Sequence, residues 1–344
     1  MVRFQIELKN WYQQNKRDLP WRHTKNPYKV WLSEVILQQT RVAQGLSYYQ
    51  RFVSSFPTVT DLAMASEQEV LNLWKGLGYY SRARNLLRTA KQVEHEHNGV
   101  FPNKYDDLIK LTGIGPYTAA AISSFCFDEQ QAVLDGNVFR VLSRVNDLST
   151  PINTSKGMKE FSLLAKTYLN LKDPATHNQA IMEFGALHCT PKKPKCSTCP
   201  FTIECLALKN GNIEERPQKL KKLKKKSRYL LYKVYTDSKA KKVFMKQRTE
   251  KDIWLNLYDF ELQEFLTEGE FNAVVNQKKE LNFKQKTHKL THQTLYVGFV
   301  QEEVGPTTKI NTALKPYSKK ELENLPVAAL HQKYIEESLG FLAS

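Results

Sequence analysis

The sequence lacks long hydrophobic runs. No stretch approaches the ~20 consecutive apolar residues of a membrane-spanning helix, so we predict no transmembrane segment. The N-terminal stretch MVRFQIELKNWYQQN has no apolar core of about 7–15 residues and no small-residue cleavage site, which argues against a signal peptide. With 344 residues, of which 41% are hydrophobic, the chain is long and apolar enough for about two domains. We expect a cytoplasmic protein.

Acidic residues are also scarce. Only 35 Asp and Glu oppose 51 Lys and Arg, which leaves a formal net charge of +16. Binding to a polyanion relieves the self-repulsion of such a chain, and nucleic acid is the leading candidate because its phosphates release counterions on binding. A basic surface without a specific partner is the alternative.

Cysteine is rare and unevenly placed. Of five cysteines, Cys189, Cys196, Cys199 and Cys205 lie within seventeen residues, in the spacing C-x6-C-x2-C-x5-C. Without a signal peptide, clustered thiols are expected to bind metal rather than to form disulfides. One short loop suits a [4Fe–4S] cluster, with a thiolate for each iron, better than zinc, which usually takes two separate pairs. Zinc, and His188 as a rival ligand, are the alternatives.

Alternating polar and apolar residues are missing from the first part of the chain. Residues 1–215 are therefore predicted to be helical, and Ser66 and Glu69 have the spacing of a capping box. The segment 216–228 has eight Lys or Arg in thirteen residues and no acid, which predicts a linker that is solvated or contacts DNA. Residues 229–344 include the alternating stretches YLLYKVYTD, KKVFMKQRT and HQTLYVGFVQE and end in a helical region, which predicts a smaller α+β domain.

Two glycines, Gly113 and Gly115, lie in LTGIGPYTAAAIS between two segments that are predicted to be helical. Glycine lets the backbone approach another surface, and the start of the second helix offers free N–H groups, so such a turn binds a phosphate without reading a base. We predict a helix-hairpin-helix at about residues 105–123. An ordinary joint between two helices is the alternative.

Two carboxylates have surroundings suited to acid–base chemistry. Glu34 lies in VWLSEVILQQTR among apolar neighbours, which raise the pKa of a carboxyl and favour its protonated form, unless it faces solvent on the polar side of its helix. Asp135 precedes a helix in VLDGNVFRVLSR and is either the N-cap of that helix or a carboxylate facing a cleft. A protonated acid beside an ionised one is the pair that cleaves glycosidic bonds.

Together these motifs resemble one family, the adenine DNA glycosylases of the MutY type, within the helix-hairpin-helix, iron–sulfur glycosylases. The resemblance is carried by LPW, YKVWLSEVILQQT, GLGYYSRARNL, GIGPYTAAAI, LDGNVFRVLSR and the cysteine spacing. It implies a mainly α catalytic region whose residues 1–26 pack with the cysteine side, and a [4Fe–4S] cluster on the four cysteines. It further implies removal of adenine mispaired with 8-oxoguanine or guanine from double-stranded DNA, as bacterial base excision repair.

The resemblance also implies roles for individual residues. Glu34 matches the acid that protonates N7 of adenine, and Asp135 matches the carboxylate that stabilises the oxocarbenium-like sugar before water attacks C1′. Tyr117 stands where strand-cleaving relatives carry a lysine. Because tyrosine has no amine to form a Schiff base, we expect a monofunctional glycosylase in which Tyr117 assists the acid–base pair. Asn137 is expected to position Asp135 or the water.

Four further residues match family positions that contact DNA. Gln39 corresponds to a wedge that fills the space left by the flipped adenine, and Tyr79 to a ring beside 8-oxoguanine. Arg22 and Glu183 match positions that line the adenine pocket.

The C-terminal region resembles the family's MutT-like (Nudix-fold) domain, which reads 8-oxoguanine. It lacks the hydrolase signature G-x5-E-x7-R-E-x-x-E-E, so we expect no phosphohydrolase activity. Where the family commonly has Phe-Ser-His, this chain has Leu290, Thr291 and His292, which keeps a hydroxyl and loses an aromatic ring. We expect a monomer associated with the nucleoid through DNA, with a sliding clamp or a downstream AP endonuclease as candidate partners.

Two rival functions follow from the same residues. A glycosylase for thymine or oxidised pyrimidines is one, and the absence of lysine at position 117 disfavours its lyase form. A catalytically silent DNA-binding protein is the other, and it predicts that Glu34 and Asp135 are dispensable.

Overall fold

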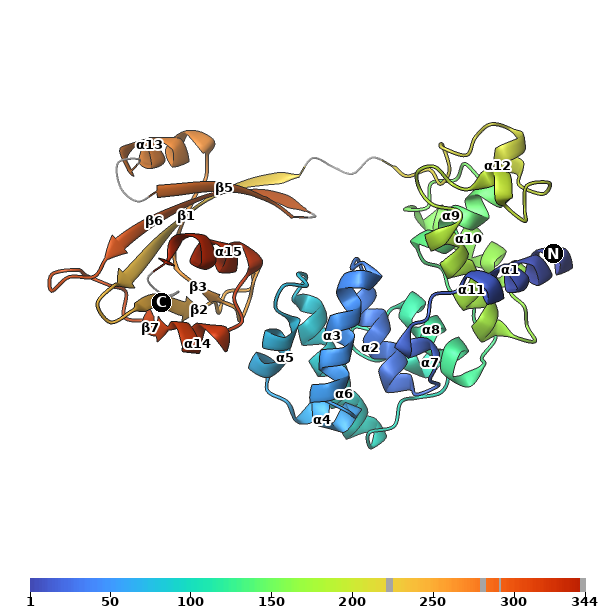
Figure 1. The fold of residues 1–344 in the computed structure, drawn as a ribbon, viewed down its shortest axis with the longest axis horizontal. Helices are drawn as coiled ribbons and strands as arrows, with labels where there is room; N and C mark the ends of the chain where they lie inside the picture. Colours follow the sequence, from blue (N-terminus) through green and yellow to red (C-terminus); the bar gives the residue numbers. More distant parts are fainter. Residues whose placement is uncertain (221–224, 279–282, 291, 341–344) are drawn as a thin grey trace. The chain divides into compact units, whose positions relative to one another are not determined.

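The computed structural model describes residues 1–220, 225–278, 283–290 and 292–340, and the chain divides into two compact units. Unit 1 comprises Met1–Ala65 and Asn85–Lys222, and unit 2 comprises Ser66–Arg84 and Leu223–Ser344. Unit 1 is helical, whereas unit 2 is built on a sheet (Figure 1). No helix in the described part of the chain is long and apolar enough to cross a membrane.

Residues 1–220 form helices and no strand, as predicted. The longer α-helices are α1 (Val2–Asn15), α2 (Pro27–Leu37), α3 (Val42–Ser55), α5 (Glu67–Trp74), α6 (Ser81–His97), α8 (Pro116–Phe127), α9 (Gly136–Val145), α10 (Ser155–Tyr168) and α11 (Pro174–Leu187). Short helices are η1 (Pro20–Arg22), α4 (Val59–Met64), α7 (Tyr105–Leu108), η2 (Cys196–Thr198) and α12 (Leu206–Lys209).

The starts of these helices follow from local chemistry. The predicted capping box at α5 is confirmed, because the Ser66 side chain accepts from the Glu69 N–H and the Glu69 side chain accepts from the Ser66 N–H. Asp135 caps α9 and Asp173 caps α11 in the same way, each through its carboxylate. α8 begins at Pro116, where the missing N–H costs no intrahelical bond.

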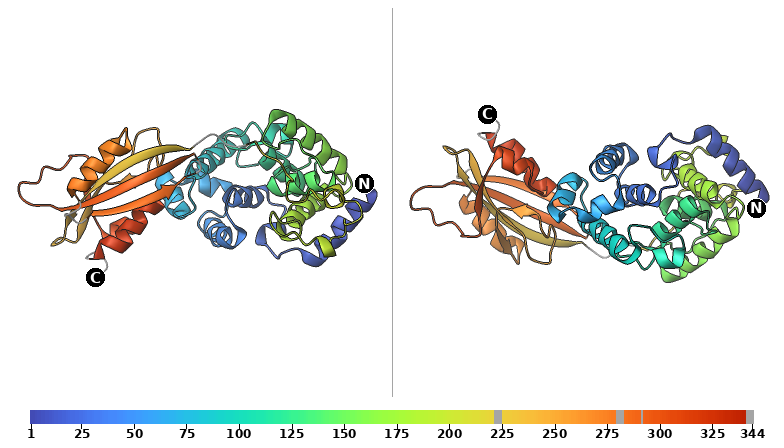
Figure 2. Two further views of the ribbon diagram at one scale, coloured as in Figure 1. Left: turned by 90° about the horizontal axis from the view of Figure 1, so that it is seen from above. Right: turned by 90° about the horizontal axis from the view of Figure 1, so that it is seen from below.

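The N-terminal helix packs where the resemblance implied. Figure 2 shows α1 alongside α11 and the loop that carries the cysteines. The ring of Phe4 stacks on Phe201 at 4.4 Å between centroids, and Arg3 Nη1 lies 2.8 Å from Glu204 Oε1. Both partners lie in the Cys189–Cys205 loop, so the prediction for residues 1–26 is confirmed for α1.

Unit 2 contains a seven-stranded sheet in the order β3-β2-β1-β6-β5, with β4 paired to β1 and β7 to β2. The strands are β1 (Lys226–Asp237), β2 (Lys242–Gln247), β3 (Tyr258–Asp259), β4 (Glu261–Phe265), β5 (Phe283–Lys289), β6 (Gln293–Glu303) and β7 (Lys315–Ser318). β1 and β6 run parallel, whereas β4 pairs antiparallel with β1 and β5 with β6.

Both faces of this sheet are covered by helices. Alternate β1 residues point to opposite sides, so Leu230 and Tyr232 join the core under α15 (Ala329–Ser338), while Leu231 joins the core under α13 (Glu268–Lys278). Figure 1 shows α13 and α15 on either side of β1 and β6. The third helix, α14 (Lys319–Glu323), precedes α15. This α+β architecture confirms the prediction for the C-terminal region.

Unit 2 also includes Ser66–Arg84. Within the unit, Tyr80 Oη donates to the carbonyl oxygen of Val327 at 3.1 Å, and Asn72 Nδ2 donates to that of Asn324 at 2.7 Å.

The register of β1 and β6 brings two segments together at one end of the sheet. Lys226 pairs with Gln293, so both strands begin at the same edge. Lys225 Nζ donates to the carbonyl oxygen of Leu290 at 2.9 Å, and the Lys226 N–H donates to that of His292 at 3.3 Å. The end of the basic linker is therefore hydrogen-bonded to the residues that flank Thr291, which itself lies outside the described residues.

Candidate active site

One cavity of about 1050 Å³ in unit 1 gathers the residues that were predicted to do chemistry. It is lined from residues 17–22, from α2 and the segment after it, from α8, from the start of α9, and from α11. The predicted residues in its wall are Arg22, Glu34, Gln39, Tyr117, Asp135, Asn137 and Glu183. The first and last of them in the sequence, Arg22 and Glu183, are 161 residues apart and are joined by hydrogen bonds.

Glu34 is buried, with 7% of its surface exposed, on a helix whose other faces are also buried. The solvent-facing alternative is therefore wrong. Burial raises the pKa of Glu34 to about 7; the nearby charge of Asp135 also raises it, whereas the Tyr117 hydrogen bond and Arg22 lower it. Tyr117 Oη lies 2.6 Å from Glu34 Oε2. The carboxyl therefore holds a transferable proton near neutral pH.

Asp135 is both an N-cap and a cavity carboxylate, so its two interpretations are compatible. Its Oδ1 accepts from the N–H groups of Asn137 and Val138 at 2.9 and 2.8 Å, and its Oδ2 accepts from Asn137 Nδ2 at 2.7 Å. Burial raises the pKa of Asp135, while these hydrogen bonds and Arg140 oppose the rise. The hydrogen bonds hold the carboxylate in one orientation and favour its ionised form.

Glu183 is the fixed anion of the cavity wall. Arg22 donates to both of its carboxylate oxygens, at 2.9 and 2.7 Å, and Arg17 does so at 2.8 and 2.6 Å. Although burial acts against ionisation, these donors lower the pKa of Glu183 to about 2. The cavity thus presents one carboxyl that holds a proton, Glu34, and one that does not, Glu183.

Gln39 and Tyr79 have an unusual backbone. Their φ angles are 56° and 49°, in the left-handed region that residues other than glycine seldom adopt. Gln39 is exposed at the cavity, two residues after the end of α2, and Tyr79 is 45% exposed in unit 2. Local strain of this kind is common where a side chain must be presented to a ligand.

The predicted hairpin uses its two glycines differently. Gly113 has a φ of 79°, and a Cβ there would lie 2.8 Å from Cβ of Asn85, so both conformation and space require glycine. Gly115 is extended and caps α8, with open space where a Cβ would be. α7 is shorter than expected, because it ends at Leu108. The N–H groups at the start of α8 are available to an anion.

Two protein families match parts of the chain, one in each region. Residues 32–166 match the HhH-GPD superfamily of base excision DNA repair proteins, and residues 233–337 match the NUDIX domain. An adenine DNA glycosylase of Buchnera aphidicola subsp. Schizaphis graminum is 38% identical over 299 residues, which cover 84% of each chain. The chain belongs to the adenine DNA glycosylase family. It is a DNA glycosylase, an enzyme that binds DNA and hydrolyses N-glycosyl bonds.

Other relatives match about 60% of this chain. The adenine DNA glycosylase of Mus musculus is 44% identical over 226 residues, which cover 62% of this chain and 44% of the mouse protein. A thermostable thymine-DNA glycosylase superposes with a TM-score of 0.56 at 28% identity, covering 60% of this chain and 95% of its own. An endonuclease III–DNA complex, at 23% identity and a TM-score of 0.52, shares the fold.

The four thiols of the glycosylase surround a common space. Among the described residues, no three His, Cys, Asp or Glu side chains come close enough to hold a single metal ion. Two donors point at the sulfur atoms: Arg144 Nη1 lies 3.4 Å from Cys189 Sγ, and the Phe201 N–H lies 3.4 Å from Cys199 Sγ. Four cysteines around one space match the single ligand that each iron of a [4Fe–4S] cluster requires. The cysteines that line this cavity are Cys189, Cys196, Cys199 and Cys205.

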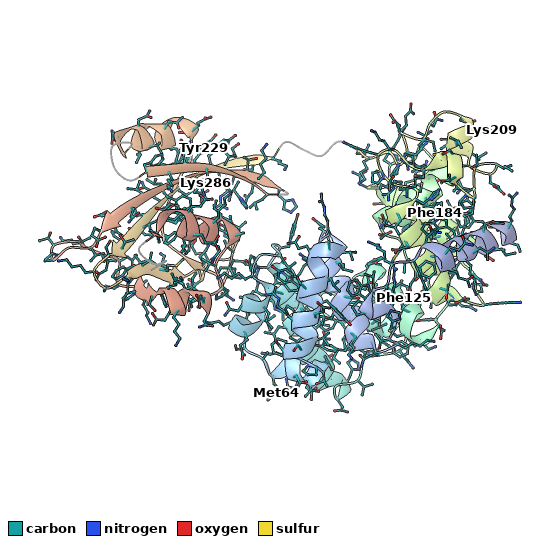
Figure 3. The ribbon with its side chains drawn as sticks, in the orientation of Figure 1. Met64, Phe125, Phe184, Lys209, Tyr229 and Lys286 are labelled. Carbon is teal, nitrogen blue, oxygen red and sulfur yellow. The ribbon has the colours of Figure 1, made fainter. Side chains whose placement is uncertain are left out.

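His188, the rival ligand, is packed among aromatic rings. It ends α11 and stacks on Phe184 at 5.0 Å between centroids, with Trp11 edge-on at 5.8 Å. Phe184, labelled in Figure 3, also meets Phe201 at 5.1 Å. The ring thus packs beside the cysteine loop and lines the same space as the four cysteines.

Sequence reasoning missed Arg140. Its Nη2 donates to Asn137 Oδ1 at 2.8 Å and to the Gly185 carbonyl, and its Nε donates to the Cys189 carbonyl at 2.7 Å. It thus joins the partner of Asp135 to the first cysteine. The available signal was a charged residue among the apolar positions of VFRVLSR, where burial requires a partner.

Gly185 was missed as well. A Cβ at this position would lie 2.6 Å from Cβ of Asn137. α11 therefore needs glycine to let the start of α9, and with it Asp135, approach. A glycine inside a predicted helix was the signal.

Two of the residues that were predicted to read the lesion, Leu290 and His292, lie in unit 2. Leu290 is partly buried against the core under α15, and His292 is exposed before β6. Thr291 lies outside the described residues.

Proposed function

We propose that this glycosylase removes adenine mispaired with 8-oxoguanine or guanine and leaves an abasic site without cutting the strand. The observation that carries the proposal is the buried Glu34, whose pKa is raised to about 7, in one cavity with the ionisable Asp135. The identity of its relatives supports adenine as the base.

The residues divide the chemistry between leaving group and sugar. Glu34 gives its proton to N7 of a flipped adenine as the C1′–N9 bond breaks, so the base leaves neutral with the bonding electron pair. The negative charge of Asp135 stabilises the cationic sugar. Water then adds to C1′, and its proton returns to the Glu34 carboxylate. Asn137 fixes the Asp135 carboxylate through the 2.7 Å contact.

Strand cleavage is not expected, because Tyr117 has no amine to attack C1′. The test uses a duplex with one adenine opposite 8-oxoguanine, under single-turnover conditions, with and without alkali. We expect base release without alkali and strand breaks only after it. Breaks before alkali would contradict the monofunctional proposal, and release of thymine in place of adenine would contradict the adenine proposal.

Discrimination between 8-oxoguanine and guanine is proposed to depend on Leu290, Thr291, His292 and Tyr79. We expect excision opposite both bases, since the chemistry resides in unit 1 whereas these residues belong to unit 2. Rates measured opposite 8-oxoguanine and guanine, for the wild type and for Thr291→Ala, test this. An equal loss opposite both bases would contradict a role in lesion reading.

The DNA-binding surface is proposed to include the hairpin at Gly113 and Gly115 and the basic linker. The net charge of the chain, +16, suits binding to a phosphate backbone. A monomer acting alone on DNA is the simplest assembly, and a clamp or AP endonuclease partner is proposed only on the family resemblance.

We further propose that the four cysteines bind a [4Fe–4S] cluster, which supplies a structural cross-link within the loop. Replacing Cys196 by alanine should lower the iron content of the purified protein well below the ~4 atoms of an intact cluster. Iron and sulfide analysis with the visible absorption spectrum measures this. Cys126→Ala is the control, because this buried cysteine lies outside the loop. Zinc in place of iron and sulfide would overturn the proposal.

The pH profile of excision should be bell-shaped. Glu34 must be protonated, so the rate should fall as the pH rises through about 7, and Asp135 must be ionised, so the rate should also fall in acid. In the wild type, the hydrogen bond from Tyr117 lowers the pKa of Glu34. Tyr117→Phe removes this bond, so the pKa of Glu34 should rise and the alkaline limb should move to higher pH. Single-turnover rates across pH measure both limbs. An unmoved alkaline limb in Tyr117→Phe would assign it to another group.

A further inference from the structure

A second cavity of about 610 Å³ adjoins the active-site cavity in unit 1. Four residues line both cavities. The shared lining residues are Arg17, Arg22, Phe125 and Gln179. Phe125, near the end of α8, is labelled in Figure 3. The remaining wall of the second cavity comes mainly from the segment after α1 and from the start of α11.

Helix α11 runs past both cavities. Ala175 and Thr176 line only the second one, Gln179 lines both, and Met182 and Glu183 line only the first. These positions are three to four residues apart, so they follow one another along one face of the helix. This face of α11 therefore lines both the Glu34 cavity and the second cavity.

Arg17 and Arg22, which line both cavities, pair with Glu183, and the three side chains differ in how much of their surface is exposed. Glu183 is 1% exposed and Arg22 is 11% exposed, but 34% of the Arg17 side chain is exposed. Arg17 is therefore the member that can swing outward, while the two hydrogen bonds from Arg22 keep Glu183 paired. A passage can open without leaving a buried charge alone, which would be costly.

The lining of the second cavity suits a neutral heterocycle better than an anion. Three of the four Lys and Arg side chains in its wall pair with carboxylates. Lys25 contacts Asp128 at 2.5 Å, and Arg17 and Arg22 both contact Glu183.

The same lining offers what a purine base needs. Tyr12 and Phe125 provide buried aromatic surface, and Thr176 and Gln179 provide polar atoms for ring nitrogens. Tyr12 Oη holds the Gln179 side chain at 2.8 Å. Apolar walls with a few fixed polar groups are the usual composition of a small-molecule site.

We propose that the second cavity receives the excised purine and is its exit, so that the base leaves while the abasic DNA is still bound. The segment that carries the predicted wedge, Gln38–Val42, lines the first cavity and not the second. Base release is thereby separated from DNA release. This inference rests on the proposed function, because it requires base excision.

The test fills the second cavity from α11. Ala175→Trp places a large ring in this cavity at a position that does not line the first one. A duplex with radiolabelled adenine and a fluorescent strand lets cleavage, base release and DNA release be followed separately, by acid quench, rapid filtration and anisotropy. In the wild type, we expect the base to be released before the DNA. In Ala175→Trp, we expect the rate of glycosidic-bond cleavage to be unchanged and base release to be slower by about tenfold or more.

Two further variants make the result decisive. Leu171→Trp adds the same ring at an exposed site outside both cavities and should release base at the wild-type rate. Ala175→Phe places a smaller ring at the same position and replaces Ala175→Trp if that variant fails to fold by circular dichroism. Wild-type base release from a folded filled-cavity variant, or retention of base until DNA leaves the wild type, would overturn the inference. Absence of cleavage in the wild type would instead refute the proposed function, and with it the inference.

Discussion

Glu34→Gln should reduce single-turnover adenine release by about 10²–10⁴-fold, the usual contribution of a general acid. Glutamine has nearly the same volume as glutamate and can still accept the hydrogen bond from Tyr117. In the wild type, this bond is 2.6 Å long. It cannot deliver a proton to N7 at any pH near neutrality. The protein should therefore fold and bind duplex DNA as the wild type does, and only the chemical step should fail.

The measurement is base release under single-turnover conditions, with DNA affinity measured in parallel. Glu94→Gln is a suitable control, since this glutamate of α6 bonds to Thr60 and does not line the cavity. Wild-type excision by Glu34→Gln would assign the acid to another group. Loss of DNA binding together with excision would instead indicate a structural role for Glu34.

Asp135→Asn should have the second largest effect, a loss of about 10²–10³-fold in the excision rate, because a full negative charge beside the cationic sugar is removed. Asparagine is as good an N-cap as aspartate, so α9 should still begin at Gly136. The loss of rate should persist at every pH, since the missing charge cannot be restored by titration.

Asp173→Asn is the matched control for Asp135→Asn. Asp173 caps α11 as Asp135 caps α9, but its side chain bonds to Lys9 and lies outside the active-site cavity. Both variants should have similar melting temperatures, and only Asp135→Asn should lose excision. Equal rates for the two variants would show that the Asp135 carboxylate serves α9 alone.

Much of the fold was predictable because local signals agree with it. The capping box at Ser66 and the alternating β1, β2 and β6 all form as expected. The strands that were missed, such as β5, are polar: FKQKTHK lies at an edge of the sheet and has one paired neighbour. Edge strands carry lysines that discourage further pairing, and these hide the alternating pattern.

The active site was predictable only in part. Glu34 and Asp135 stand in recognisable motifs, and the cavity does bring them together. Arg140 and Gly185 lie 45 residues apart in the sequence, and their roles depend on the approach of α9 to α11, which no local pattern in the sequence indicates. The second cavity depends on how the segment after α1 meets α8 and α11, and no local sequence feature encodes such a meeting.

Because β1 and β6 begin side by side, insertions and deletions in the linker should have different effects on either side of Lys225. Because Lys225 Nζ and the Lys226 N–H donate to the carbonyl oxygens of Leu290 and His292, the final residues of the linker are fixed to the end of β5 and the start of β6. Insertions upstream of Lys225 change only the length of the linker, whereas a deletion that removes Lys225 or shifts the start of β1 also breaks these hydrogen bonds. Natural variation in linker length should therefore accumulate before Lys225 and stop there.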